Sequence, residues 1–191
     1  REVFLQAYEL KKANEALQSC LATSAQTQVY NARFLNSRLS EECNRAKRYR
    51  RSLSCLLAAI DSMPELAEFQ DSVFSEAIVQ EVMRFLKENI RSVDVVIRYT
   101  DNRLVAILPE TEFNQARIVV NRIRFAVEKS TFRVKEKELK LTVSVGLISF
   151  NPAVHRGKED VLEGLEKALL EARQNGSNQI VGSANETPPA V

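Results

Sequence analysis

The chain has 191 residues, 45% of them hydrophobic and 27% charged, which suits a soluble globular protein with one well-buried domain and an extension. Its net charge of +2 gives no reason to expect a nucleic acid or an acidic membrane surface as a partner. We find no apolar run of the roughly 18–20 residues that cross a membrane and expect no signal peptide. The single histidine, His155, is too few for a zinc cluster or a Ser-His triad.

The three cysteines are Cys20, Cys43 and Cys55. Their odd number and their lack of metal-ligand spacing argue against a disulfide framework and favour a reducing compartment. We therefore expect a cytoplasmic protein in which all three act as small apolar residues, packed on helices and a strand.

The first predicted element is a helix over residues 1–22, which contain no Pro or Gly. Val3, Leu10 and Leu17 recur every seven residues, as in a short coiled-coil seam. Such a helix either packs on its own domain or joins two chains. We expect the second, with residues 1–26 forming a signalling stalk that makes a homodimer.

The rest of the chain alternates segments of helical and strand periodicity, which we expect to form one domain over residues 27–182. The predicted helices are 31–48, 72–90, 111–129 and 158–174, and the predicted strands are 52–60, 93–99, 104–108, 131–135, 139–149 and 178–181. This order predicts an α/β (α+β) fold of the ferredoxin-like type, with a mixed central sheet covered by helices. We expect residues 183–191 to form a disordered tail.

Two of these strands, 93–99 and 104–108, flank a polar tetrad that runs from Thr100 to Arg103. The tetrad contains Asp and Asn, which tolerate the positive φ of a tight turn. The stretch therefore predicts a β-hairpin with both strands buried, and its tip is a natural place for functional side chains.

Around this hairpin the sequence resembles the signature of GGDEF domains, the diguanylate cyclase family. That signature is an RxxD pair, five spacer residues and a Gly-Gly-Asp/Glu-Glu-Phe turn, followed by apolar residues and Leu-Pro. Arg91 and Asp94 match RxxD and Pro109 closes the run, whereas the turn reads Thr100-Asp101-Asn102-Arg103-Leu104. The resemblance covers about residues 27–181 and implies the nucleotide-cyclase form of the ferredoxin-like fold.

The catalytic half of the family pattern is missing. The family binds GTP with Mg²⁺ through an Asp at the end of the first strand and through the third residue of the turn; these positions hold Ala59 and Asn102 here. A methyl group and an amide cannot replace two carboxylates around Mg²⁺. Asp61 matches the second Asp of the family's strand-end motif, and alone it is better explained as a strand-end or capping residue.

Other substrate positions have changed as well. The resemblance aligns Thr100 and Asp101 with the two turn glycines, Arg103 with the turn Glu, Pro64 and Arg173 with two phosphate-contacting Lys residues, and Ala67 and Glu76 with the Asn and Asp that contact guanine. We therefore expect no catalytic residues, no bound Mg²⁺ or other cofactor, and no cyclase activity.

The regulatory half of the pattern is present. In the family, cyclic di-GMP binds at the RxxD site with help from one Arg on the following helix and another on a neighbouring domain. Arg91, Asp94, Arg122 and Arg45 match these four positions. The residue types suit the ligand, because an Arg fork bonds guanine or phosphate and stacks on purines, and an Asp accepts from guanine N–H groups.

Three functions are compatible with this pattern. We expect a catalytically inactive GGDEF domain that acts as a cyclic di-GMP receptor and couples ligand binding to signalling, with an effector protein as a possible partner. One alternative is a structural pseudo-enzyme that uses Thr100 to Leu104 for dimerisation or protein contact without nucleotide. The other is a domain that still binds GTP or is weakly active, which Ala59 and Asn102 disfavour.

Overall fold

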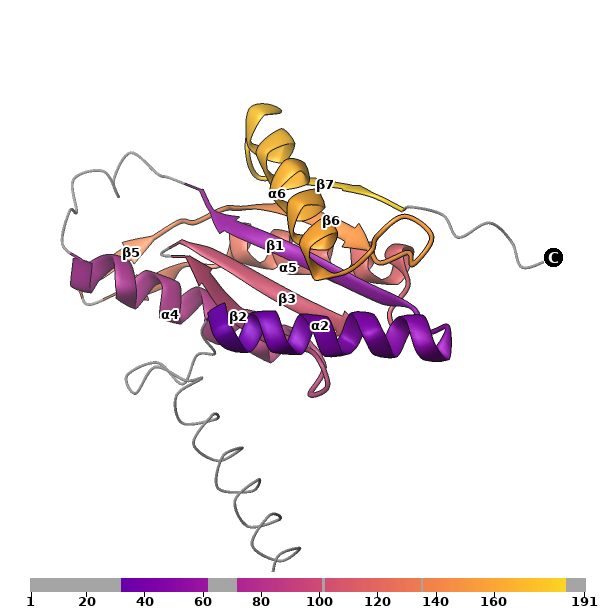
Figure 1. The fold of residues 1–191 in the computed structure, drawn as a ribbon. Coiled ribbons are helices and arrows are strands. Elements are labelled where there is room, and N and C mark those ends of the chain that lie inside the picture. The colour runs from indigo at the N-terminus through magenta and orange to yellow at the C-terminus, as the bar shows by residue number, and fades with distance from the viewer. Residues whose placement is uncertain (1–31, 62–71, 101, 135, 185–191) are drawn as a thin grey trace, which may run out of the picture.

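The computed structural model of the protein describes residues 32–61, 72–100, 102–134 and 136–184 (Figure 1). The predicted stalk over 1–26 lies outside these residues, and so do Cys20 and all but the first two residues of the predicted tail. None of the helices that the structure describes is long and apolar enough to span a bilayer.

The centre of the fold is a mixed five-stranded sheet in the order β2-β3-β1-β6-β7. The central strand is β1 (Leu53–Ile60), whose eight residues are all buried. It pairs antiparallel with β3 (Arg103–Pro109) and with β6 (Val143–Ser149). The outer strands are β2 (Val95–Thr100), antiparallel to β3, and β7 (Ile180–Ser183), parallel to β6. The predicted mixed sheet is confirmed.

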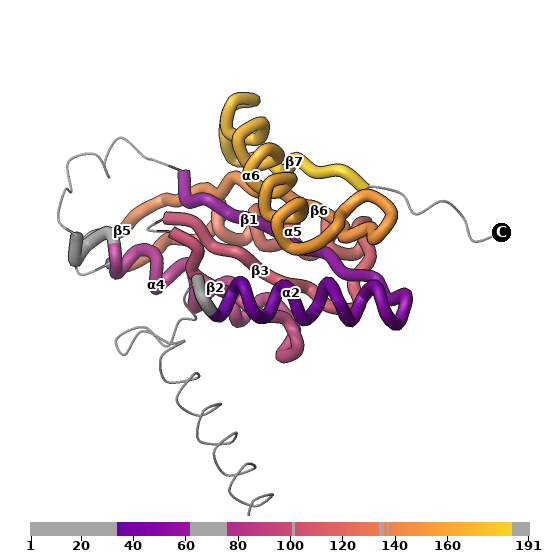
Figure 2. Tube along the Cα trace, in the orientation of Figure 1, coloured from indigo at the N-terminus to yellow at the C-terminus, as the bar shows by residue number. Residues whose placement is uncertain are grey.

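Helices cover both faces of this sheet, so the domain has three layers (Figures 1 and 2). One face packs on α4 (Ser72–Asn89) and α5 (Phe113–Lys129), and the other on α2 (Ala32–Tyr49) and α6 (Lys158–Gln174). Side chains alternate along a strand, and this alternation divides β1 between two hydrophobic cores: Leu56, Ala58 and Ile60 face α4 and α5, whereas Leu53, Cys55, Leu57 and Ala59 face α2 and α6.

Cys43 and Cys55 behave as predicted, since both are free and buried in the core beneath α2. Burial, with the nearby carboxylates of Glu159 and Glu42, raises the pKa of the Cys43 thiol to about 12. Burial likewise raises the pKa of Cys55. Both thiols are therefore protonated at neutral pH and act as apolar side chains.

The segment predicted as one strand over 139–149 is divided in the structure. Its first residue belongs to β5 (Lys137–Leu139), which pairs back onto β4 (Phe132–Val134) as a separate two-stranded sheet, and β6 begins only at Val143. Hydrophobic packing explains the split: Phe132, opposite Leu139 in this hairpin, makes an edge contact with Phe85 of α4 at 5.9 Å between ring centroids.

The last strand begins two residues later than predicted, at Ile180 rather than 178. The chain before it turns through three residues with positive φ, which are Gly176, Ser177 and Asn178. Left-handed backbone is incompatible with an extended strand, so β7 can start only after this turn.

Candidate ligand-binding site

A pocket of about 560 Å³ opens between the end of α4, the turn that follows it and α5. Three of the four residues predicted to bind a ligand, Arg91, Asp94 and Arg122, line this pocket. Its remaining walls come from Glu88, Asn89, Ile90, Leu108, Thr111, Gln115 and Val119.

The turn from Arg91 to Asp94 is closed by two hydrogen bonds between these residues. The backbone N–H of Arg91 donates to Asp94 Oδ2 at 2.8 Å, and the backbone N–H of Asp94 donates to the Arg91 carbonyl at 3.1 Å. The other carboxylate oxygen, Asp94 Oδ1, is buried and accepts no hydrogen bond from the described residues. Burial raises the pKa of Asp94, and the Arg91 N–H and charge only partly oppose this.

Arg122 is held at the rim of the pocket by the end of α4. Its Nη2 donates to the Asn89 carbonyl at 2.9 Å, and the Asn89 side chain in turn donates to the Phe85 carbonyl at 2.8 Å. Carbonyls at a helix C-terminus favour a nearby cation. Within the described chain, neither Arg91 nor Arg122 is paired with a carboxylate at salt-bridge distance, so both guanidinium groups can face an anionic or acceptor-rich ligand.

The fourth predicted residue, Arg45, lies elsewhere. It is on α2, on the opposite face of the sheet, and forms a 3.5 Å ion pair with the buried Glu42. The sheet separates it from the pocket of the same molecule. The expectation that an Arg at this position acts on a ligand held by another domain stays a prediction.

The hairpin with the altered signature turn is present, as β2 and β3. In the turn, the Asn102 carbonyl accepts from Ile60 N–H at 3.1 Å, and Arg103 Nη1 contacts Glu166 of α6 at 2.6 Å. Arg103 lies opposite Ala59 in the strand register, and Leu104 is buried. Asp101 lies outside the described residues, as do Pro64 and Ala67.

The residues at the family's metal positions do not fit Mg²⁺. Ala59 is fully buried and offers only a methyl group, and Asn102 offers a neutral amide. Mg²⁺ requires several oxygen ligands in octahedral geometry, usually including carboxylates. The nearby carboxylate of Asp61 is already occupied by neighbouring groups of the protein.

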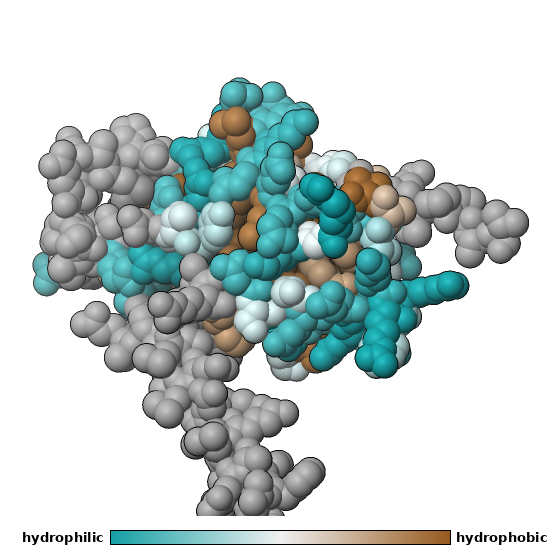
Figure 3. Space-filling view, in the orientation of Figure 1, coloured by the Kyte–Doolittle hydropathy of each residue, from teal (hydrophilic) through white to brown (hydrophobic). Residues whose placement is uncertain are grey.

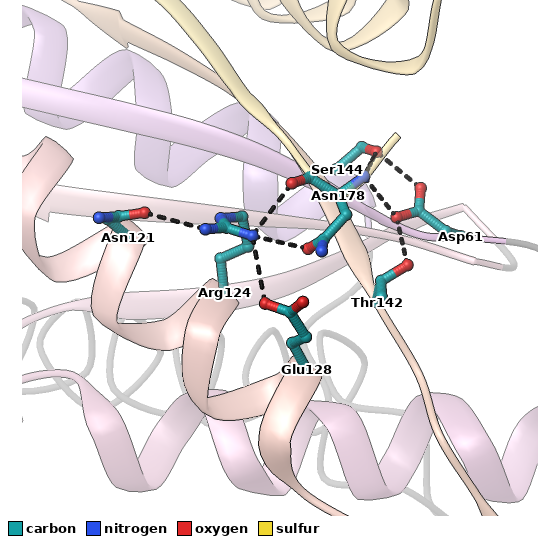
Figure 4. Close-up of polar contacts among 7 residues, drawn as sticks. All are labelled: Asp61, Asn121, Arg124, Glu128, Thr142, Ser144 and Asn178. Atoms are coloured by element: carbon teal, nitrogen blue, oxygen red, sulfur yellow. Dashed lines mark hydrogen bonds and ion pairs between the residues drawn. The ribbon is translucent and has the colours of Figure 1, made fainter. Parts of the chain in front are cut away.

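Asp61 is buried at the end of β1 and ties three strands together (Figure 4). Its Oδ1 accepts from Ser144 Oγ at 2.6 Å, and its Oδ2 accepts from Thr142 Oγ1 at 2.7 Å and from Asn178 N–H at 3.0 Å. Arg124 extends the network, because its Nη1 donates to the Asn178 carbonyl at 3.1 Å and to Asn178 Oδ1 at 2.9 Å. The geometry is that of the strand-end residue that the sequence predicted.

Two further residues stand at substrate positions of the family. Glu76 is paired with another side chain, and Arg173 lies on α6. Arg98 of β2, which sequence reasoning missed, forms an ion pair with Glu76 and lowers the pKa of that carboxyl. Arg173 lies in the last turn of α6 and lines a second pocket of about 450 Å³ with Arg103 and the exposed Leu170. In the space-filling view, apolar surface shows beside α6 on this side of the molecule (Figure 3).

The sequence matches the family described as "Diguanylate cyclase, GGDEF domain" over residues 22–179. Diguanylate cyclase A of Treponema denticola is 30% identical over 139 residues, which are 73% of this chain and 37% of that protein. Response regulator PleD of Caulobacter vibrioides is 27% identical over 164 residues, or 85% of this chain and 36% of the relative. The chain therefore spans little more than a third of these relatives.

Solved structures share the fold. The coiled coil and GGDEF domain of DgcB from Caulobacter crescentus, crystallised with c-di-GMP, superposes with a TM-score of 0.80 at 16% identity, covering 95% of this chain and 96% of that one. Diguanylate cyclase SiaD of Pseudomonas aeruginosa, crystallised with its activator SiaC, gives a TM-score of 0.80 at 23% identity, covering 96% of this chain and 70% of SiaD. Because the family match covers most of the chain, the protein belongs to the GGDEF family of diguanylate cyclase domains.

Proposed function

We propose that this chain is a cyclic di-GMP receptor that has lost cyclase activity, and that the ligand binds in the pocket formed by Arg91, Asp94 and Arg122. The proposal builds on membership of a bacterial family whose relatives include diguanylate cyclases. It adds two claims of our own, which are the absence of turnover and the use of this pocket.

The receptor claim rests on the hydrogen-bonding groups that Asp94, Arg91 and Arg122 present in the pocket. Asp94 presents a buried oxygen that accepts no hydrogen bond from the part of the chain that the structure describes, and leaving such a group unpaired costs about 1–3 kcal/mol. Guanine presents the N1–H and N2–H donors that would satisfy it. The guanidinium groups of Arg91 and Arg122 supply donors for guanine O6 and N7 or for phosphate. A pocket of about 560 Å³ is also within the usual range for small-molecule sites.

The loss of turnover is supported by the remains of the metal site. Phosphoryl-transfer chemistry of this class depends on Mg²⁺ to neutralise charge that develops on phosphate oxygens. Here Ala59 and Asn102 provide no carboxylate, and Arg103 adds a cation that is already paired with Glu166 at 2.6 Å. We therefore propose a domain that reads the nucleotide without making it.

Isothermal titration of the protein with cyclic di-GMP tests the receptor claim. We expect micromolar or tighter binding, and a loss of at least tenfold in affinity for Arg91→Ala and for Arg122→Ala. Arg117→Ala is the matched control, because Arg117 is an exposed arginine on the same helix as Arg122 but does not line the pocket. Absence of binding by the wild-type protein would instead favour the nucleotide-free pseudo-enzyme.

We also propose that the receptor is a dimer, joined by the stalk over 1–26 and bridged by Arg45 of one molecule to ligand held by the other. The position of Arg45 on the face opposite the pocket supports bridging between molecules. Light scattering with and without cyclic di-GMP measures the mass directly. Arg45→Ala should weaken dimerisation only when ligand is present, and a monomer under both conditions would contradict this part of the proposal.

A further inference from the structure

A third hollow, of about 610 Å³, lies between α5 and the start of β7. It shares no lining residue with the ligand pocket. Its walls are Asn114, Arg117, Ile118, Asn121 and Arg124 of α5 and the residues Asn178, Gln179 and Ile180. We call this hollow the α5–β7 groove.

One side of the α5–β7 groove is the open edge of the sheet. β7 is the last strand in the sheet order and pairs only with β6 among the described strands. Val145 N–H donates to the Gln179 carbonyl at 2.8 Å. Because backbone groups alternate in direction along a parallel strand, the N–H and C=O groups of Ile180 and Gly182 point away from β6, toward the open edge.

The other side of the groove is basic and partly apolar. Ile118, which lines the groove, is 71% exposed, and Phe125, one heptad further along α5 and outside the lining, is 48% exposed. Arg117 is exposed as well, whereas Arg124 pairs with Glu128 at 3.5 Å; no carboxylate stands among the described residues that line the groove. An exposed sheet edge beside a helix with apolar and basic side chains has the chemistry of a peptide-binding groove.

Arg124 fixes the width of the groove. Its two hydrogen bonds to Asn178 connect α5 to the residues just before β7, and the Asp61 network holds Asn178 from the other side (Figure 4). Asn178 itself is in a left-handed conformation, with φ of 51°. The strand edge and the helix are therefore held in place before any partner arrives, which lowers the entropic cost of binding.

We propose that the α5–β7 groove binds an extended acidic segment of a partner protein, which adds as a strand beside β7. Every second side chain of an added strand would point toward α5, where acidic residues meet Arg117 and apolar residues meet Ile118. A second copy is a poorer occupant, because two such edges facing each other would bring the same arginines together.

Selection of random decapeptides by phage display on the full chain tests the proposal, followed by fluorescence polarisation of the selected peptides. We expect peptides in which acidic and apolar residues alternate, with micromolar affinity. Arg117→Glu should weaken their binding at least tenfold. Lys129→Glu, an equal charge reversal on an exposed residue of α5 outside the groove, should leave it within twofold.

A backbone measurement separates strand addition from contact with side chains alone. Amide hydrogen exchange should show the N–H groups of Ile180 and Gly182 becoming protected when peptide is bound. Ile180→Pro, which removes one outward donor, should weaken binding at least tenfold, provided that its circular dichroism and melting curve match those of wild type. If this variant does not fold, the hydrogen-exchange measurement decides whether the peptide adds as a strand.

Several results would overturn the proposal. They are failure to select any peptide, a selected consensus without acidic residues, binding that Arg117→Glu leaves unchanged, and amides of Ile180 and Gly182 that stay unprotected. Self-association that Ile180→Pro abolishes would make a second copy the occupant. None of these results depends on whether cyclic di-GMP binds, so this inference and the receptor proposal fail or succeed separately.

Discussion

Replacing Asp94 by Asn should separate ligand affinity from stability. The substitution keeps the shape of the side chain, and the amide oxygen can still accept the 2.8 Å hydrogen bond from Arg91 N–H. The amide NH₂ then takes the place of the unpaired buried Oδ1. A donor would face the guanine N1–H and N2–H donors, so the contact changes from attractive to repulsive.

The size of the effect follows from the contact that is lost. A bidentate contact to a base edge is worth about 1–3 kcal/mol, which corresponds to a loss of roughly 5- to 150-fold in affinity. The unliganded protein should respond differently. Since burial raises the pKa of Asp94, the folded state binds a proton there more readily than the unfolded state, and the ionised carboxylate destabilises the folded protein at neutral pH. Asp94→Asn should therefore melt at the same temperature as wild type or slightly higher.

The assay is calorimetric titration with cyclic di-GMP at several pH values, alongside thermal melting. Because burial raises its pKa, Asp94 takes up a proton at a higher pH than an ordinary aspartate, so wild-type affinity should fall as the pH is lowered, whereas the affinity of Asp94→Asn should change little. The reasoning is refuted if Asp94→Asn binds within twofold of wild type, or if the wild-type and variant affinities depend on pH in the same way.

Three further predictions concern activity and stability. Incubated with GTP and Mg²⁺, neither wild type nor Asn102→Asp should form cyclic di-GMP in multiple turnovers, because Ala59 still provides no ligand; steady product formation on chromatography would contradict this. Asp61→Ala should lower the free energy of unfolding by about 2–5 kcal/mol in urea denaturation, because it removes the acceptor for three hydrogen bonds, and a loss under 1 kcal/mol would show that water replaces it. Gly146→Ala should disrupt folding, since an added Cβ would lie 2.5 Å from the Leu165 carbonyl oxygen. The control Gly164→Ala, whose added Cβ has its nearest contact at 3.4 Å, should be tolerated. Equal melting temperatures of the two variants would refute the steric argument.

Periodicity and turn chemistry were enough to predict most of the fold. The helix expected over 158–174 is α6, with the same bounds, and the hairpin around Thr100 and Arg103 is present. Local patterns failed where long-range packing decides the structure. Nothing in the alternation of residues 139–149 shows that Leu139 pairs with Phe132 and leaves the main sheet.

The sequence predicted some residues of the candidate site and missed others. The family resemblance pointed to Arg91, Asp94 and Arg122, and all three line one pocket in the structure. Sequence could not reveal that Asn178 and Arg124 hold the strand ends together, because these residues meet across 54 positions of chain. It also could not reveal that Arg98 pairs with Glu76, since neither residue belongs to a local pattern that joins a helix to a strand.

The central position of β1 has a consequence for how this domain is made in the cell. Leu57 pairs on one side with Val105 and on the other with Gly146, so β1, the first of the described strands to be synthesised, finds its second neighbour only after most of the domain has been made. Contacts so distant along the chain slow folding. Until β6 emerges, an apolar strand has one unpaired edge, which is the kind of surface that aggregates. Production of the domain should therefore depend on chaperones that hold nascent chains, more strongly than its final stability would suggest.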